Sequence, residues 1–174
     1  MSETVAVRSG SSAPWQPAAL ARLIALLLPL VLLGGALGSQ YLGGLHPCEM
    51  CYWQRWPHGA AIVLALLSFT APASSLRSRA LVLLAALAIA SSGGIGVYHA
   101  GVEAKIFEGF TQCTALPRTS SAAELLKEIT QAPLVRCDEV QFRFLGISMA
   151  GWNAILSLTG ATLILLLSLR RRRA

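Results

Sequence analysis

Two cysteines separated by two residues carry the clearest chemical signal in this sequence. Cys48 and Cys51 lie in a short polar gap between two apolar stretches, and Arg55 follows four residues after Cys51. A Cys-x-x-Cys pair can hold a reversible disulfide, a metal ion or a haem. Haem attachment requires a histidine directly after the second cysteine, and that position is Tyr52. We therefore expect redox chemistry from this pair at the surface of a membrane.

Arg55 is the cation expected to act on the cysteine pair. If a helix has begun by Cys51, the two residues share a face one turn apart. A nearby cation lowers the pKa of a thiol, and Arg55 could also donate hydrogen bonds to an electron acceptor bound there. The alternative is an arginine that only extends its charged end to the membrane surface. The sequence leaves both interpretations open.

Two further cysteines, Cys113 and Cys137, enclose 23 residues in a long loop. Such wide spacing suits a disulfide that exchanges with a protein partner, and it equally suits a structural staple. A zinc site usually pairs two short Cys-x-x-Cys motifs, and this chain has only one, so we predict no metal site. Four cysteines allow three pairings, and the sequence does not choose among them.

The composition predicts a membrane protein. Of 174 residues, 55% are hydrophobic and only 13% are charged, against roughly 25% charged residues in soluble domains. Four apolar stretches are candidates for membrane spans, which need about 20 residues each. We predict a single all-α membrane domain over residues 1–174, a bundle of four transmembrane helices with a long outer loop. The helices are expected at about 18–38, 52–71, 80–98 and 150–169, the outer loops at about 39–51 and 99–149, and a polar tail at 1–17.

The charges predict the orientation. Four spans place both termini and residues 71–79 on one side, which has eight arginines and one acid, whereas the other side has six cations and seven acids. The positive-inside rule puts the arginine-rich side in the cytoplasm, so the net charge of +6 reflects topology and predicts no nucleic-acid binding. All four cysteines then face an oxidising compartment, which in a bacterium is the periplasm. The cytoplasmic arginines are Arg8, Arg22, Arg77, Arg79, Arg170, Arg171, Arg172 and Arg173.

Small residues predict close packing between helices. Gly34 and Gly38 in the first span, and residues 91–96 in the third, would let a neighbouring backbone approach. In the long loop, Ser121 begins a Ser-Ala-Ala-Glu capping box that apolar residues at helical spacing follow. We expect a short amphipathic helix there, on the membrane surface or against the bundle.

The ordered set of motifs resembles the bacterial disulfide-bond formation protein B (DsbB) family. The set comprises residues 47–55 (Pro-Cys-Glu-Met-Cys-Tyr-Trp-Gln-Arg), Tyr98-His99, the Cys113 and Cys137 pair, and Phe144-Leu145-Gly146 before Trp152. Together with four spans and the charge asymmetry, the resemblance covers most of the chain. Each motif is weak alone, whereas their order along the chain is specific.

The resemblance implies a quinone-dependent thiol oxidase of the bacterial inner membrane, with both termini cytoplasmic. Cys113 and Cys137 would oxidise a periplasmic DsbA-like protein of the thioredoxin fold. Cys48 and Cys51 would then receive the electrons and pass them to ubiquinone or menaquinone. The sequence between Cys113 and Cys137 departs from the best-known members, so the identity of the partner is open.

The resemblance also implies a quinone site. Cys51 corresponds to the cysteine that contacts the quinone, Arg55 to an arginine that binds it, and His99 to a position near it. Taken by itself, His99 is equally an ordinary histidine at the membrane interface. A DsbA-type disulfide has a potential of about −120 mV, and glutathione couples are too reducing to regenerate it, whereas a respiratory quinone is sufficiently oxidising.

Two other functions remain as alternatives. A membrane scaffold would keep both disulfides as structural staples. An enzyme similar to vitamin K epoxide reductase would also combine a four-helix bundle with a Cys-x-x-Cys motif. That motif is then expected near the end of the chain, so its position after the first span disfavours this alternative.

Overall fold

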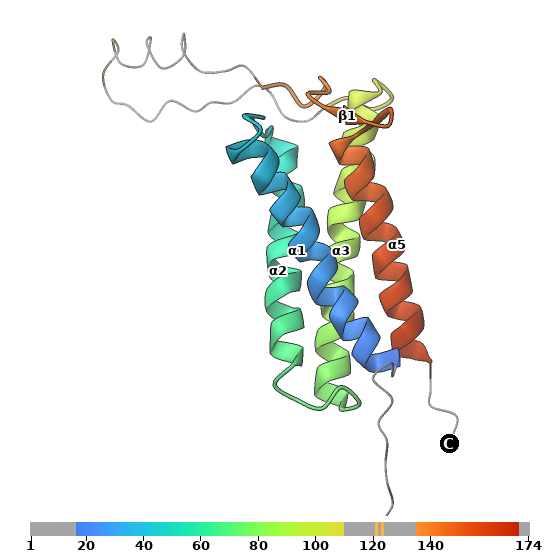
Figure 1. The fold of residues 1–174 in the computed structure, drawn as a ribbon. Coiled ribbons are helices and arrows are strands. Elements are labelled where there is room, and N and C mark those ends of the chain that lie inside the picture. Colours follow the sequence, from blue (N-terminus) through green and yellow to red (C-terminus); the bar gives the residue numbers. More distant parts are fainter. Residues whose placement is uncertain (1–16, 110–120, 122, 124–134, 171–174) are drawn as a thin grey trace, which may run out of the picture.

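Helices make up most of the described structure. The computed structural model describes residues 17–109, 121, 123 and 135–170. Within them, four long helices lie side by side, with a small hairpin at one end (Figure 1). The elements are α1 (Pro17–Tyr41), α2 (Glu49–Ser68), α3 (Leu76–Glu103), β1 (Arg143–Phe144), β2 (Ile147–Ser148) and α5 (Met149–Leu169). Cys113 and the amphipathic helix predicted after Ser121 lie outside the described residues.

Three of the four described helices could cross a membrane. α1, α3 and α5 are long and apolar enough by length and composition. α2 has 20 residues, but its first half contains Glu49, Gln54, Arg55 and His58, which make it more polar. The fourth span therefore remains a prediction.

The helices extend further into polar sequence than the hydropathy pattern predicts. α2 begins at Glu49 rather than at about 52, and α3 runs from Leu76 to Glu103 rather than over about 80–98. At the start of α3, the side chain of Ser75 accepts a hydrogen bond from the backbone N–H of Ser78. Such a cap stabilises the end of a helix among polar residues, which a prediction from hydropathy alone leaves outside the helix.

A two-residue hairpin precedes α5, and the all-α prediction did not include it. Leu145 and Gly146 form its turn with φ angles of 52° and 81°, the left-handed conformation that tight two-residue hairpins require. The indole N–H of Trp152 donates to the backbone O of Phe144 at 2.9 Å, and the two rings are 6.3 Å apart. The Phe-Leu-Gly motif and Trp152 thus fix the hairpin on the first turn of α5.

Glycines bring α3 close to α5. A Cβ atom at Gly93 or Gly96 would lie between 2.9 and 3.1 Å from atoms of α5. The predicted close approach at residues 91–96 is therefore confirmed at these two positions. The same prediction is wrong for Gly34 and Gly38, where a Cβ atom would meet no described atom within 4 Å.

Arg22 ties the start of α1 to the end of α2. Its Nη1 donates to the backbone O of Ser68 at 3.1 Å and of Ala71 at 3.0 Å, and the guanidinium lies 4.2 Å from the ring centroid of Phe69. A cation at this place satisfies carbonyl groups that a helix C-terminus leaves open. The contact therefore stabilises the packing of the two helices.

Replacing Arg22 by methionine is expected to lower the free energy of unfolding by about 1–3 kcal/mol, because hydrogen bonds from a charged donor contribute about that much. Thermal unfolding in detergent measures the change. Arg77→Met, at an exposed arginine near the same end, is the control and should cost less than about 0.5 kcal/mol. Equal destabilisation by the two variants would show that the Arg22 contacts contribute nothing specific.

Candidate functional site

The Cys48–Cys51 pair lies at the N-terminus of α2. Cys48 is the N-cap residue, and its backbone O accepts hydrogen bonds from the backbone N–H groups of Cys51 at 3.1 Å and Tyr52 at 3.3 Å. The two sulfur atoms are 3.3 Å apart, with Cys48 donating to Cys51. A disulfide bond is about 2.05 Å long, so the structure describes separate thiols. A helix N-terminus favours negative charge, which stabilises a thiolate at Cys51.

Cys137 packs against this pair, although it is distant in the sequence. It is buried in a small cluster with Cys48, Met50 and Val102, and Cys51 packs against that cluster. Hydrogen bonds to Cys137 and then to Cys51, together with burial, raise the pKa of Cys48. The sulfur atoms of Cys137 and Cys51 therefore both contact that of Cys48, which allows disulfide exchange through Cys48. The resemblance implied a role for Cys137 but gave no position for its side chain.

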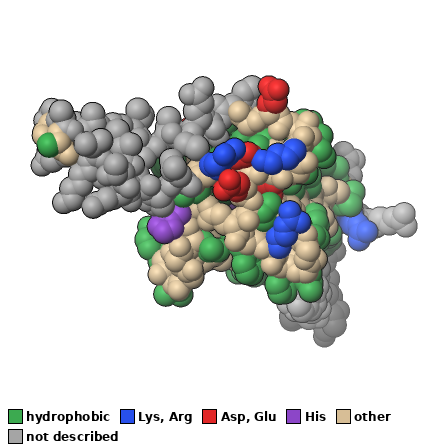
Figure 2. Space-filling model, turned by 90° about the horizontal axis from the view of Figure 1, so that it is seen from above, with side chains coloured by type: hydrophobic (Ala, Val, Ile, Leu, Met, Phe, Trp, Pro, Cys, Tyr) green, Lys and Arg blue, Asp and Glu red, His purple; other side chains and the backbone are tan. Residues whose placement is uncertain are grey.

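Charged side chains hold the segment around Cys137 on the end of α3. Asp138 accepts hydrogen bonds from Arg136 at 2.9 and 2.7 Å and forms an ion pair with Lys105. Arg136 and Lys105 hold the pKa of Asp138 well below its ordinary value. Figure 2 shows basic and acidic side chains next to each other on this end of the molecule. Since exposed ion pairs contribute little stability, their main effect is to position the segment.

Arg55 lies one helical turn after Cys51 and reaches α1. Its guanidinium donates to the side-chain O of Gln40 and, at 3.1 Å, to the backbone O of Ala36. It also lies 5.2 Å from the ring centroid of Tyr52. Its Nε is buried and has no hydrogen-bond partner among the described residues. These contacts hold a positive charge next to the cysteine pair.

His99 reaches the cysteine pair from α3. It is 3% exposed, and its Nε2 lies 3.5 Å from the Sγ of Cys48 and 3.9 Å from a carboxylate oxygen of Glu103. Its other ring nitrogen, Nδ1, lies 2.8 Å from the side-chain nitrogen of Gln54. The structure thus brings His99 against a sulfur atom of the cysteine pair.

Behind His99, a buried polar network includes residues that the sequence analysis did not single out for chemistry. Gln54 accepts a hydrogen bond from Asn153 at 2.7 Å, Asn153 accepts one from His58 at 2.9 Å, and Ser92 lies 3.0 Å from His58. The sequence predicts only close helix packing for Ser92. The network could have been suspected from the glutamine, histidine and asparagine in apolar segments, because a polar group without a partner is unfavourable there.

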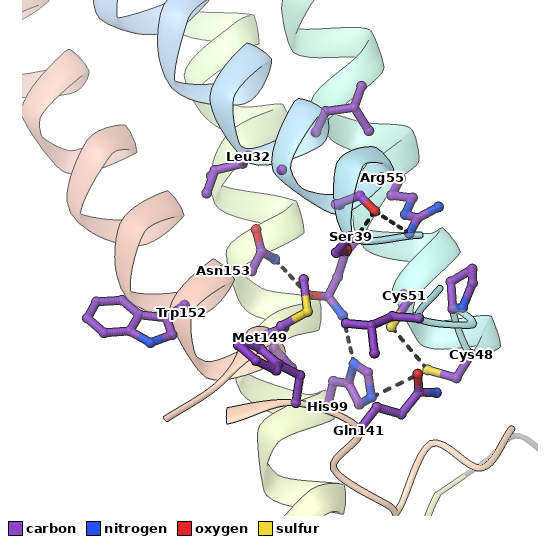
Figure 3. A pocket seen from close by; sticks show the side chains of 18 of the residues that line it. Leu32, Ser39, Cys48, Cys51, Arg55, His99, Gln141, Met149, Trp152 and Asn153 are labelled. Carbon is purple, nitrogen blue, oxygen red and sulfur yellow. Dashed lines mark hydrogen bonds between the residues drawn. The ribbon is translucent and has the colours of Figure 1, made fainter. Parts of the chain in front are cut away.

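A cavity of about 300 Å³ lies beside the cysteine pair, lined by α1, α2, α3 and α5 (Figure 3). The lining from α1 is mostly apolar (the apolar wall), whereas Cys48 and the other helices contribute most of the polar side chains (the polar wall). The volume is at the lower end of the range for small-molecule sites. The apolar wall includes Val31, Leu32, Leu33, Gly35 and Ala36, and the polar wall includes Cys48, Cys51, Gln54, Arg55, His58, His99 and Asn153.

Cys48, Cys51 and His99 also bring three possible metal ligands within 4.8 Å of one another. The Nδ1 of His99, however, takes a hydrogen bond from Gln54, so a neutral His99 carries its proton on Nε2. Nε2 is the nitrogen that would have to bind the metal. The hydrogen bonds therefore oppose metal binding by these three residues.

Comparison with protein families agrees with this arrangement of cysteines. Residues 18–167 match the family model described as Disulfide bond formation protein DsbB. The chain belongs to the DsbB family. The DsbB match runs from the first turn of α1 to the last turn of α5 and includes all four cysteines. It supports disulfide oxidoreductase chemistry in a multi-pass membrane protein.

Individual relatives are similar over most of their length. The Disulfide bond formation protein B of Marinobacter nauticus is 30% identical over 145 residues, which cover 80% of this chain and 85% of the relative. The Disulfide bond formation protein B 1 of Pseudomonas fluorescens is 27% identical over 160 residues, with coverage of 85% and 88%. An uncharacterized protein of Rickettsia prowazekii is 25% identical over 139 residues, with coverage of 78% and 79%. No solved structure matches the chain.

Proposed function

We propose that this chain is a quinone-dependent thiol oxidase of the bacterial inner membrane. It would reoxidise a periplasmic DsbA-like protein and pass the electrons to membrane ubiquinone or menaquinone. The observation that supports this best is the position of Cys137 against Cys48, with Cys51 next to them on the wall of the cavity. This order lets electrons pass by disulfide exchange from the outer loop to the cysteine pair beside the partly apolar cavity.

Each cycle begins at Cys113 and Cys137, the loop pair. The two thiols of the partner become a disulfide, while the Cys113–Cys137 disulfide becomes two thiols. The Cys137 thiolate then attacks Cys48, the Cys48–Cys51 bond breaks, and Cys51 leaves as a thiolate. Cys113 next attacks Cys137, which restores the loop disulfide and releases Cys48. The two electrons from the partner then reside on the Cys48–Cys51 dithiol.

The residues around the cavity fit a quinone. The apolar α1 wall suits the ring and its isoprenoid tail, and the buried Nε of Arg55 is a donor without a partner among the described residues, which suits a carbonyl oxygen. When bound there, a quinone would accept the two electrons and two protons that the Cys48–Cys51 dithiol releases on closing to a disulfide. Arg55 supplies positive charge where negative charge develops, and Cys51 supplies the sulfur at the cavity wall.

The proposed orientation places the cysteines on the periplasmic side. α1 begins and α5 ends at one end of the molecule, where Arg22 and Arg79 lie (Figure 1). Cys48, at the N-terminus of α2, and Cys137, which packs against it, lie at the opposite end (Figure 1). α2 packs against α1 and α3, which supports a fourth span despite its polar first half.

The purified chain in detergent is expected to reduce ubiquinone when it receives a reduced DsbA-like protein. Two partner thiols should disappear for each quinone consumed, and quinone absorbance together with thiol titration measures both. Activity with menaquinone alone would identify the acceptor. A chain that exchanges disulfides with the partner but leaves every quinone unchanged would refute the proposed acceptor.

Arg55→Met is expected to raise the KM for quinone about tenfold, because a hydrogen bond from a charged donor contributes about 1.5–3 kcal/mol. Steady-state rates at varied quinone concentration measure this, with the partner at saturation. Arg143→Met removes an exposed cation on the same side and serves as the control. An unchanged KM would mean that Arg55 only ties α2 to α1 through Gln40 and Ala36.

A further inference from the structure

The side chain of Gln54 is held in one orientation by its surroundings. It is 6% exposed, and its Nε2 lies 3.1 Å from the backbone O of Met50 and 2.8 Å from the Nδ1 of His99. A backbone carbonyl can only accept a hydrogen bond. The backbone O of Met50 therefore requires the Gln54 amide to point its nitrogen toward it. The same nitrogen then faces His99.

Asn153 fixes the same orientation from the other end of the Gln54 amide. Its Nδ2 lies 2.7 Å from the Oε1 of Gln54 and 3.2 Å from the backbone O of Ser92. Because the Ser92 carbonyl also only accepts, Asn153 must present its nitrogen to Gln54. Two independent backbone acceptors thus determine both amides, and the two assignments agree.

The orientation of Gln54 determines which nitrogen of His99 carries the proton. Nδ1 accepts from Gln54, so a neutral imidazole is protonated on Nε2. Nε2 is the nitrogen 3.5 Å from the Sγ of Cys48 and 3.9 Å from Glu103, and the imidazole also donates to the backbone O of Cys137, which likewise requires the proton on Nε2. His99 therefore presents an N–H donor to Cys48 rather than a lone pair that could take a proton from it.

We propose that Gln54 is a positioning residue, which holds His99 as an Nε2–H donor so that this N–H stabilises Cys48 as a thiolate. The benefit for turnover rests on the proposed function. When Cys113 attacks Cys137, the Cys113–Cys137 bond forms, the Cys48–Cys137 bond breaks, and Cys48 keeps both bonding electrons. A donor at Cys48 stabilises the charge on this leaving sulfur.

The protonation of His99 can be observed directly by nitrogen-15 NMR on histidine-labelled protein, because the chain has only three histidines. His99→Gln assigns the signal. In the unmodified protein we expect a protonated Nε2 and a bare Nδ1. Gln54→Glu, which cannot donate to Nδ1, should protonate Nδ1. A protonated Nδ1 with a bare Nε2 in the unmodified protein would overturn the proposal.

The effect on Cys48 can be measured in a protein in which Cys51, Cys113 and Cys137 are replaced by serine. Thiolate absorbance then reports Cys48 alone. Gln54→Met and His99→Phe are each expected to lower the ratio of thiolate to thiol at a given pH about tenfold, the size of one charge-assisted hydrogen bond. Combining the two changes should add little, because Gln54 acts through His99.

Ser68→Ala is the matched control, since Ser68 is another fully buried polar side chain of α2 and bonds only within its own helix end. It should leave the ratio unchanged. The proposal would also be overturned if Gln54→Met left the ratio of thiolate to thiol at Cys48 unchanged while the variant unfolded at the same temperature as the control. Neither measurement involves a quinone or a partner, so their outcome is independent of whether the chain is a quinone-linked oxidase.

Discussion

Cys51→Ser is expected to lower quinone reduction at least about a thousandfold, because the variant lacks the sulfur at the wall of the cavity and has no nucleophile of comparable strength there. The side chain is nearly the same size, so folding should be preserved. Quinone absorbance in the presence of reduced partner measures the rate. The unfolding temperature of the variant in detergent should match that of the unmodified chain.

The same variant is also expected to accumulate a Cys48–Cys137 disulfide. With Cys51 absent, Cys48 is left with the sulfur that it contacts in the buried cluster. Non-reducing peptide mapping by mass spectrometry detects this pair. Full turnover by Cys51→Ser, or its isolation with Cys48 paired only to Cys113, would contradict the assigned order of sulfur atoms.

Cys137→Ser is expected to separate the two halves of the reaction. Reduction of quinone driven by the partner should fall at least about a hundredfold, because the serine hydroxyl cannot exchange with Cys48. Reduction of quinone driven by a small dithiol such as dithiothreitol should remain within about threefold, because the Cys48–Cys51 pair and the cavity are intact. Both rates come from the same absorbance assay.

Cys113→Ser provides the comparison for this experiment. The proposal assigns both cysteines of the loop pair to exchange with the partner, so this variant should lose the partner-driven rate and keep the dithiothreitol-driven rate. An equal loss of both rates in Cys137→Ser would mean that Cys137 mainly supports the structure around Cys48. Equal retention of both would mean that the partner exchanges directly with Cys48 and Cys51.

Local features of the site could be predicted from the sequence. The spacing of Cys51 and Arg55 places them one turn apart on any helix, and α2 does contain both. The apolar stretches predicted the three helices that can span a membrane. These predictions succeeded because they depend on residues close together in the chain.

Contacts between distant segments could not be predicted in the same way. The spacing of Cys137 in the sequence does not predict its contact with Cys48. That contact depends on the ion pairs that hold the segment around Cys137 at the end of α3. The hydrogen bonds that join Gln54, Asn153 and His99 cross three helices, so only their polarity in apolar sequence hinted at them. The sequence also could not predict the hydrogen bonds of Arg55 to Gln40 and Ala36 on α1.

We propose that electrons leave the chain for quinone from the Cys48–Cys51 pair. The most direct test mixes fully reduced chain with ubiquinone, without oxygen or partner, and follows quinol formation while disulfides are trapped with acid and mapped. We expect the Cys48–Cys51 disulfide to close first, with one quinol formed for each disulfide, and the Cys113–Cys137 disulfide to follow by exchange. Closure of Cys113–Cys137 before Cys48–Cys51, or unchanged quinone, would contradict this proposal.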